Sequence, residues 1–238
     1  MMRRVFRVDT VEEWLLKDEI EDDDKKRAVF LKLLVKTVSE PLCGKRHVDV
    51  ARKLLARGAD PNKTSYGRVS PLYLAAKAQG VYALDLVETL LAGGADANAR
   101  TSQSGRNETP LMVAIDQLSL RPSRFPALAV VRALLRGGAR IDRICGSEAA
   151  QMRMWRIERL RPELCQEQSW LACRDTVDGI WAVGSWKAFV RRPHVELFVL
   201  RALVTRDRAT TSNASLRWLV TLQNPILWRV LTYWRATS

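Results

Sequence analysis

The sequence predicts an all-α fold, a solenoid of helix-turn-helix units with protruding turns that is followed by a small helical module. Two recurring patterns predict it. The first, two leucines followed by glycine, alanine and a polar turn, occurs at residues 51–62, 87–98 and 131–142. The second, a hydroxyl residue followed by proline and leucine, begins at Ser70 and again at Thr109. Two patterns that recur in a fixed order are typical of a repeat protein.

The first pattern describes an amphipathic helix and its end. In each copy, apolar residues at i, i+3 and i+4 form one narrow stripe. Glycines at positions 58, 93–94 and 137–138 follow the stripes, and glycine readily adopts the left-handed conformation that ends a helix. The next residues, Ala-Asp-x-Asn or a relative of it, favour a tight turn. The three stripes are Ala51, Leu54 and Leu55; Val87, Leu90 and Leu91; and Val131, Leu134 and Leu135.

The second pattern describes the start of another helix. Ser70 and Thr109 can cap exposed amide groups, and the proline after each occupies the first helical position, where no amide hydrogen bond is lost. Each unit is therefore a turn, a first helix, a short loop and a second helix. Residues 28–38, rich in valine and leucine, predict one more buried helix ahead of the first clear unit.

The combined pattern resembles the ankyrin repeat, in which Thr-Pro-Leu-His-x-Ala-Ala precedes Leu-Leu-x-x-Gly-Ala-Asp-x-Asn. The resemblance covers residues 28–154, with two clear units and degenerate ones at each edge. It implies an ankyrin-repeat solenoid. Tyr73 and Met112 replace the histidine, so we expect the hydrogen bond of that histidine to be absent. The spacing of the repeats is longer than usual, which predicts enlarged loops at 101–108 and 117–126.

The chain is expected to divide into three segments. Residues 1–27 predict a capping helix at 8–17 and an acidic linker, and residues 28–154 hold the repeats. Residues 155–238 predict a tryptophan-rich helical region, in which a final helix opens at Pro225.

Three tryptophans in the last segment, Trp170, Trp181 and Trp186, are expected to be buried in short helices and turns that cover the open end of the stack. If they were exposed, they would form an aggregation-prone patch. Apolar residues at i, i+3, i+4, i+7 and i+8 from Val195 predict an amphipathic helix that begins behind Pro193.

An ankyrin array with such a helical tail resembles the ankyrin and SOCS-box proteins, which recruit substrates to a cullin ubiquitin ligase through elongin B and C. Residues 222–233 are also similar to the core of an F-box, which binds a different cullin adaptor. The chain departs from both patterns. Val199 stands where the elongin-binding helix carries cysteine, and Gln223-Asn224 interrupts the leucine-proline pair of the F-box. The tail can equally be a capping module of the array, and both interpretations stay open.

Charge, hydropathy and cysteine content indicate which classes of function to consider. The net charge of +13 comes from 39 basic and 26 acidic residues, and a basic surface can bind nucleic acid. The arginines, however, are dispersed along helices instead of clustered with aromatic residues. No apolar run approaches the ~18 residues that span a membrane, and no secretion signal is expected. The four cysteines form no CxxC pair, so reduced thiols in the cytoplasm or nucleus are expected.

No catalytic residue, cofactor or metal site is predicted. The chain holds two histidines, His47 and His194, and neither accompanies a nucleophile motif. His47 is expected at the start of a helix, in a capping or surface role. A zinc set of Cys165, Cys173 and His194 has the wrong spacing for the common zinc classes.

The candidate binding residues lie on the turn tips and the first helices, because stacked repeats leave a continuous concave surface there. Tyrosine and arginine are frequent anchors in protein interfaces. The predicted partner-binding residues are Lys63, Tyr66, Arg68, Tyr73, Arg100, Gln103, Arg106, Asn107 and Met112.

Three hypotheses for the function follow. The first is a non-enzymatic scaffold that binds another protein on the concave ankyrin surface. The alternative is a substrate receptor of a cullin ubiquitin ligase, in which the C-terminal helices also bind an adaptor. The third is a nucleic-acid-associated basic protein, which the steep salt dependence of phosphate contacts would reveal.

Overall fold

The computed structural model of the protein divides into two compact units, Met1–Trp181 and Ala182–Ser238. In the described part of the chain the regular structure is helical, with an isolated antiparallel bridge between Thr101 and Glu108. The prediction of an all-α fold is thereby confirmed. The described residues are 33–35, 37–38, 44–64, 69–101, 108–122, 126–142, 149–204 and 206.

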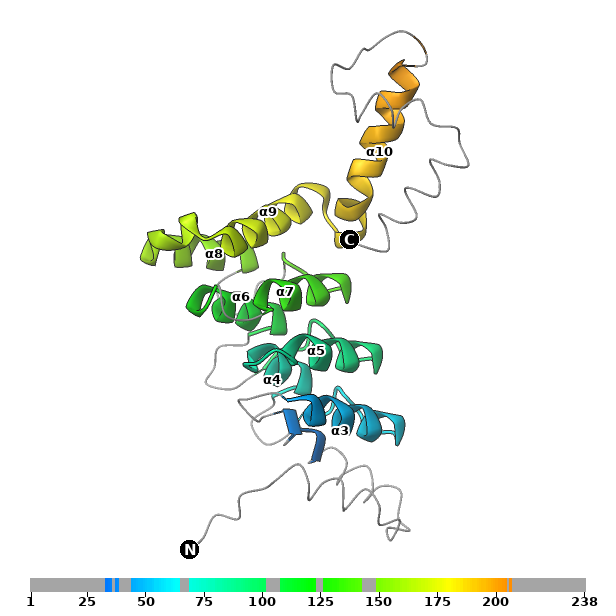
Figure 1. Ribbon diagram of the computed structural model, residues 1–238, viewed down its shortest axis with the longest axis vertical. Coiled ribbons are helices and arrows are strands. Elements are labelled where there is room, and N and C mark those ends of the chain that lie inside the picture. The colour runs from blue at the N-terminus through cyan, green and yellow to red at the C-terminus, as the bar shows by residue number, and fades with distance from the viewer. Residues whose placement is uncertain are drawn as a thin grey trace, which may run out of the picture. The chain divides into compact units, whose positions relative to one another are not determined.

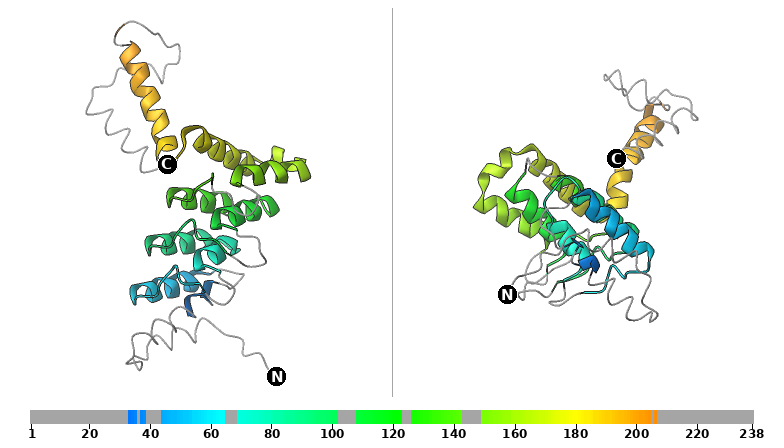
Figure 2. Two further views of the ribbon diagram at one scale, coloured as in Figure 1. Left: turned by 180° about the vertical axis from the view of Figure 1, so that it is seen from behind. Right: turned by 60° about the horizontal axis from the view of Figure 1, so that its bottom comes forward.

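The first unit is a stack of helix pairs, which Figure 1 shows from the side and Figure 2 from behind. One row of helices, which we call the inner row, consists of α4, α6 and α8, and α6 packs against both of its neighbours. In the outer row, α5 packs against α3 and α7. The inner helices are α4 (Pro71–Lys77), α6 (Pro110–Leu120) and α8 (Ala150–Leu160); the outer helices are α3 (Lys45–Ala56), α5 (Ala83–Ala92), α7 (Ala127–Arg136) and α9 (Gln168–Val183).

The inner helices begin as the sequence predicts. The Ser70 hydroxyl accepts a hydrogen bond from the backbone N–H of Tyr73 over 3.2 Å, and the Thr109 hydroxyl accepts one from Met112 over 3.4 Å. Each cap is followed by proline at the first helical position. Such a cap contributes about 1 kcal/mol to the stability of its helix.

The outer helices end at glycines, as predicted. Gly58, Gly94 and Gly138 have φ angles of 89°, 87° and 91°. This left-handed conformation lets the next backbone N–H turn back to the helix, as in the 3.0 Å hydrogen bond from Ala95 N to the Leu90 carbonyl. The glycine before the left-handed one has a different role. A Cβ added at Gly93 would lie 2.9 Å from Leu55 Cδ1, so this glycine lets consecutive outer helices approach closely.

Asparagine side chains tie each turn to the next. Asn62 Nδ2 donates to the carbonyl of Gly94 over 2.9 Å, and its Oδ1 accepts from the backbone N–H of Asp96 over 2.7 Å. Asn98 repeats the arrangement with Gly138 and Arg140, at 2.9 and 2.8 Å. The Asn of the Ala-Asp-x-Asn pattern is therefore an inter-repeat contact as well as a turn residue.

Only part of the N-terminal region is described. Residues 33–35 and 37–38 are helical, and Leu34, Thr37 and Val38 are buried, which agrees with the buried helix predicted at 28–38. The predicted capping helix at 8–17 and the acidic linker lie outside the described residues.

Helices α8 and α9 form a further pair in the first unit, linked by the 3₁₀ helix η2 (Pro162–Gln166). Arg161 Nη1 donates to the Ser119 carbonyl over 2.6 Å, and the Ser169 hydroxyl donates to the Pro122 carbonyl over 2.9 Å. These bonds fasten the pair to the preceding repeat. The segment boundary predicted after residue 154 falls inside α8, and the first compact unit extends to Trp181.

The tryptophans of this region differ in burial. Trp170 on α9 is fully buried, as predicted, and its indole N–H donates to Glu158 Oε1 over 2.8 Å. Trp181, at the other end of α9, is 51% exposed, so its predicted burial was wrong. Trp186 is half-buried and contacts Phe189 at a ring-centroid distance of 6.0 Å.

In the second unit the structure describes the long helix α10 (Trp186–Val204). Pro193 lies inside this helix, so the prediction that a helix begins behind it was wrong. The Ser185 hydroxyl caps the true start by accepting from the backbone N–H of Ala188 over 3.2 Å. The final helix predicted at Pro225 lies outside the described residues. Within the described residues, no helix combines the length and apolarity that crossing a bilayer requires.

Candidate protein-binding surface

The structure separates the nine predicted partner-binding residues into three groups. Lys63 and Arg100 are exposed on the turns that follow α3 and α5. Tyr73 and Met112 are buried, with 7% and 1% of their surface exposed. They lie at the third position of α4 and α6 and point into the stack, so neither side chain is available to a partner. The remaining residues lie outside the described part of the chain: Tyr66, Arg68, Gln103, Arg106 and Asn107.

Tyr73 anchors a polar network inside the inner row. Its hydroxyl donates to Glu108 Oε2 over 3.0 Å. The other carboxylate oxygen of Glu108 accepts from Arg153 Nη2 over 2.8 Å. Arg153 Nε also lies 3.1 Å from Asp116 Oδ1. The network therefore joins α4, the bridge residue before α6, α6 itself and α8, which belong to three successive helix pairs.

The network explains how charges are tolerated in this part of the stack. The side chains of Glu108 and Arg153 are each only 10% exposed. A buried charge is strongly unfavourable unless an opposite charge and hydrogen bonds compensate for it. Burial, and then the hydrogen bond to Glu108, raise the pKa of Tyr73 to about 12. The Tyr73 phenol thus makes a hydrogen bond of its own at the position where the ankyrin pattern has histidine.

Sequence reasoning missed both Glu108 and Arg153. The one available signal was the position of Arg153 within its helix. Arg153 is the fourth residue of α8, and the fourth residues of α4 and α6 are Leu74 and Val113. An arginine at a position that is otherwise apolar indicates a special partner. The identity of that partner could not be read from the sequence, since 45 residues separate Arg153 from Glu108.

The exposed side of the inner row is a mixed but mainly basic surface. Lys77 and Arg121, at the ends of α4 and α6, are exposed. Arg121 Nη1 donates to Gln79 Oε1 over 2.7 Å, which connects the ends of the two inner helices. Asp116 adds one partly exposed carboxylate. We define the inner-row face as these residues together with the basic turn residues: Lys63, Lys77, Gln79, Arg100, Asp116 and Arg121.

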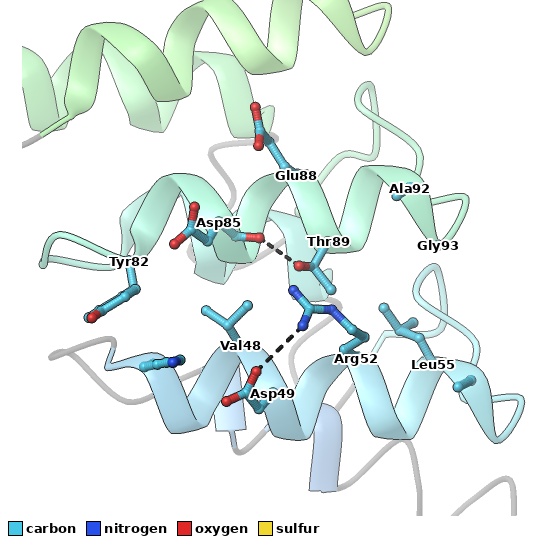
Figure 3. A pocket seen from close by; sticks show the side chains of 12 residues that line it. Val48, Asp49, Arg52, Leu55, Tyr82, Asp85, Glu88, Thr89, Ala92 and Gly93 are labelled. Atoms are coloured by element: carbon cyan, nitrogen blue, oxygen red, sulfur yellow. Dashed lines mark hydrogen bonds and ion pairs between the residues drawn. The ribbon is translucent and has the colours of Figure 1, made fainter.

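A groove of about 760 Å³ lies on the outer row, between α3 and α5 (Figure 3). Its apolar floor includes Val48, Leu55 and Ala92. Its rim is charged, and Arg52 Nη1 lies 3.5 Å from Asp49 Oδ1. At the next step of the stack, Glu88 on α5 pairs with Arg136 on α7 over 3.9 Å. In the register of α3 and α5 the corresponding residues are Arg52 and Ala92, which cannot form that pair.

Cys173 and His47 have side chains of types that occur in catalytic sites, and the structure shows the surroundings of both. Burial raises the pKa of the Cys173 thiol to about 12 despite the nearby positive charge of Arg132, so this thiol stays protonated near neutral pH. His47 Nδ1 accepts a hydrogen bond from the backbone N–H of Gly44 over 3.1 Å and so caps α3, as predicted. Among the described residues, no three potential ligands of a metal ion come together.

One comparison with known proteins identifies the architecture. Residues 69–102 match the family model described as Ankyrin repeat. This range contains α4, α5 and the turn with Asn98. No curated protein matches the chain. Ankyrin repeats are protein-interaction modules and are typically non-catalytic. The sequence pattern, the matched repeat and the stacked helix pairs together show that the chain contains an ankyrin repeat at residues 69–102, within a stack of helix pairs.

Proposed function

We propose that the protein is a non-enzymatic scaffold that binds another protein on its inner-row face. The observation that carries this proposal is that some charged residues are buried and paired inside the stack, whereas others are exposed. Glu108 and Arg153 are buried and paired with each other inside the stack, where they join successive repeats. Lys63, Lys77 and Arg100, by contrast, are exposed.

The stack supports binding because it is rigid where the face is exposed. Caps, left-handed glycines and the asparagine bridges fix each turn relative to the next. A surface that is ordered before binding loses less conformational entropy in the complex. Since three exposed lysine or arginine residues lie on this face, it fits an acidic surface of the partner, which would accelerate association and favour correct partners.

Charge reversal on this face tests the proposal. The triple variant Lys63→Glu, Lys77→Glu, Arg100→Glu is compared with wild type by affinity capture and quantitative mass spectrometry. A matched control reverses three exposed basic residues of the outer helices: Lys45→Glu, Lys53→Glu and Arg132→Glu. We expect the inner-row variant to lose the proteins that wild type and the control both retain. Equal loss in the control, or no loss in either, would contradict a specific role of the inner-row face.

The second candidate function is a substrate receptor of a cullin ubiquitin ligase. The observation that favours it is the apolar stripe predicted on α10, of which Val195 and Val199 are 57% and 54% exposed. Val199 occupies the position at which the resemblance implies an adaptor-contacting residue. Direct binding to purified elongin B and C would support this function. No binding by wild type, or the same binding by Val199→Asp, would contradict it.

A further inference from the structure

The pair α8–α9 follows the register of the preceding repeats. Gly184, directly after α9, has a φ of 82°, close to the 91° of Gly138 after α7. Counting back four residues from each glycine aligns Ile180 with Leu134, and it therefore aligns Trp181 with Leu135. The Leu-Leu-x-x-Gly pattern thus occurs a fourth time as Ile-Trp-x-x-Gly, which sequence analysis did not detect.

In the earlier repeats, the residues at this position stack on the next repeat. Leu55 reaches Gly93, and Leu91 reaches Gly137, where an added Cβ would lie 2.8 Å from Leu91 Cδ2. Leu135, at the same position of α7, is buried. The inner row behaves in the same way. The buried residues at its two stacking positions are Tyr73 and Ala76 on α4, and Met112 and Ile115 on α6.

The equivalent residues of the fourth pair are exposed instead. Met152 and Trp155 on α8 are 54% and 55% exposed, and Trp181 on α9 is 51% exposed. We call these three residues the end face. A terminal repeat normally presents a polar outer surface, because it has no neighbour to cover it. An end face with two tryptophans and a methionine instead has the composition that is typical of the centre of a protein interface.

Charged residues of both signs surround the end face. Arg159 is exposed one helical turn beyond Trp155 on the same side of α8. The neighbouring carboxylates are already engaged. Glu158 accepts from the Trp170 indole and lies 3.5 Å from Arg174, and Asp178 accepts from the Gln151 amide over 2.8 Å. Arg159 is therefore an exposed positive charge that a partner meets beside the α8 part of this end.

We propose that the end face binds a helix of another protein that carries an apolar row flanked by carboxylates. A helix is the fitting shape because the same register positions accept helices within the stack. Carboxylates are the fitting charge because they complement Arg159. Self-association of two end faces is disfavoured, since it would bring two copies of Arg159 and two chains of net charge +13 together. This interaction surface is distinct from the inner-row face.

The probe is a labelled synthetic helical peptide with leucines at i, i+3, i+4 and i+7 and glutamates on both flanks. A second peptide replaces every glutamate with lysine. Fluorescence anisotropy with the full chain is expected to show saturable binding of the glutamate peptide and roughly tenfold weaker binding of the lysine peptide. Trp155→Ala is expected to weaken binding of the glutamate peptide about tenfold or more, as loss of an interface anchor does. Val81→Ala, which removes an exposed apolar side chain elsewhere, is expected to have no effect.

Arg159→Glu tests the charge part of the proposal without removing an apolar side chain. This variant is expected to reverse the preference, so that the lysine peptide binds more tightly than the glutamate peptide. The melting temperature of each variant, compared with wild type, shows whether it folds. Three results would overturn the proposal. The first is no saturable binding of the glutamate peptide, and the second is equal binding of that peptide by wild type, Trp155→Ala and Arg159→Glu. The third is a dimer, seen in sedimentation, that Trp155→Ala dissociates. The last result would make a second copy of the chain the occupant.

Discussion

Tyr73 donates a hydrogen bond from its phenol to Glu108 over 3.0 Å, across 35 residues of sequence and between consecutive repeats. The tyrosine stands where the ankyrin pattern has histidine, and its side chain points into the stack. Glu108 in turn contacts Arg153 of the fourth helix pair. One carboxylate therefore links the second, third and fourth pairs.

Removing the Tyr73 hydroxyl should weaken this link without unfolding the protein. In Tyr73→Phe, Glu108 keeps Arg153 as its partner, and the ring still fills the same space. We expect the free energy of unfolding to fall by about 1 kcal/mol, the usual contribution of one hydrogen bond. Urea titration measures it. A variant as stable as wild type would show that the hydroxyl bond contributes nothing to the stack.

Stability should also fall at alkaline pH. The pKa of Tyr73 rises from 10.0 to about 12 on folding, mainly because burial disfavours the phenolate. Below pH 10 the phenol is protonated in both states. Between pH 10 and pH 12 the unfolded chain loses the proton first, so the unfolded state is favoured and stability decreases as the pH rises. Tyr73→Phe serves as the control, because it lacks the titrating group. If both proteins lose the same stability between pH 10 and pH 12, Tyr73 is not responsible.

Substitution of Glu108 should reduce the stability of the protein far more than substitution of Asp116, although both carboxylates contact Arg153. Glu108→Ala leaves the buried Arg153 guanidinium without its main partner, which we expect to reduce the free energy of unfolding by about 3–5 kcal/mol. Asp116 is 31% exposed, so Asp116→Ala should reduce it by less than about 1 kcal/mol. Chemical denaturation of the two variants side by side measures the difference. Equal effects would mean that Glu108 does not hold the network together.

The two adjacent leucines of α5 should differ in their contributions. Leu90 is fully buried, whereas Leu91 is half-buried and faces Gly137 of the next repeat. We expect Leu90→Ala to reduce stability by roughly 3–5 kcal/mol and Leu91→Ala by roughly 2 kcal/mol, since the cavity is larger where a side chain is fully enclosed. Thermal unfolding of both variants gives the order. The opposite order would show that Leu91 is the main core residue of the two.

The sequence was sufficient where the determinants are local. Serine and threonine caps, the prolines after them and the left-handed glycines act within a few residues, and the structure confirms these features at Ser70, Thr109 and Gly94. It was harder to predict which side of each inner helix is buried. Tyr73 and Met112 were assigned to the binding surface because the pattern locates their helix but not the side of it that the next repeat covers.

Long-range contacts and degenerate repeats were not accessible from the sequence. The pairing of Glu108 with Arg153 depends on how repeats stack, and no local pattern encodes it. The fourth helix pair has no proline at the start of its inner helix and has Ile180-Trp181 in place of Leu-Leu, so only Gly184 matches the pattern. Proline is favoured at a helix start, which predicts a helix that begins at Pro193, yet α10 continues through it.

The most direct test of the central claim is cross-linking of the full chain to its captured partners with a lysine-reactive reagent, followed by mass spectrometry. The chain provides its own control, because Lys63 and Lys77 lie on the inner-row face, whereas Lys45 and Lys53 lie on α3 of the outer row and are also exposed. We predict intermolecular cross-links at Lys63 and Lys77 that exceed those at Lys45 and Lys53. Cross-links concentrated at Lys45 and Lys53 would contradict binding on the inner-row face.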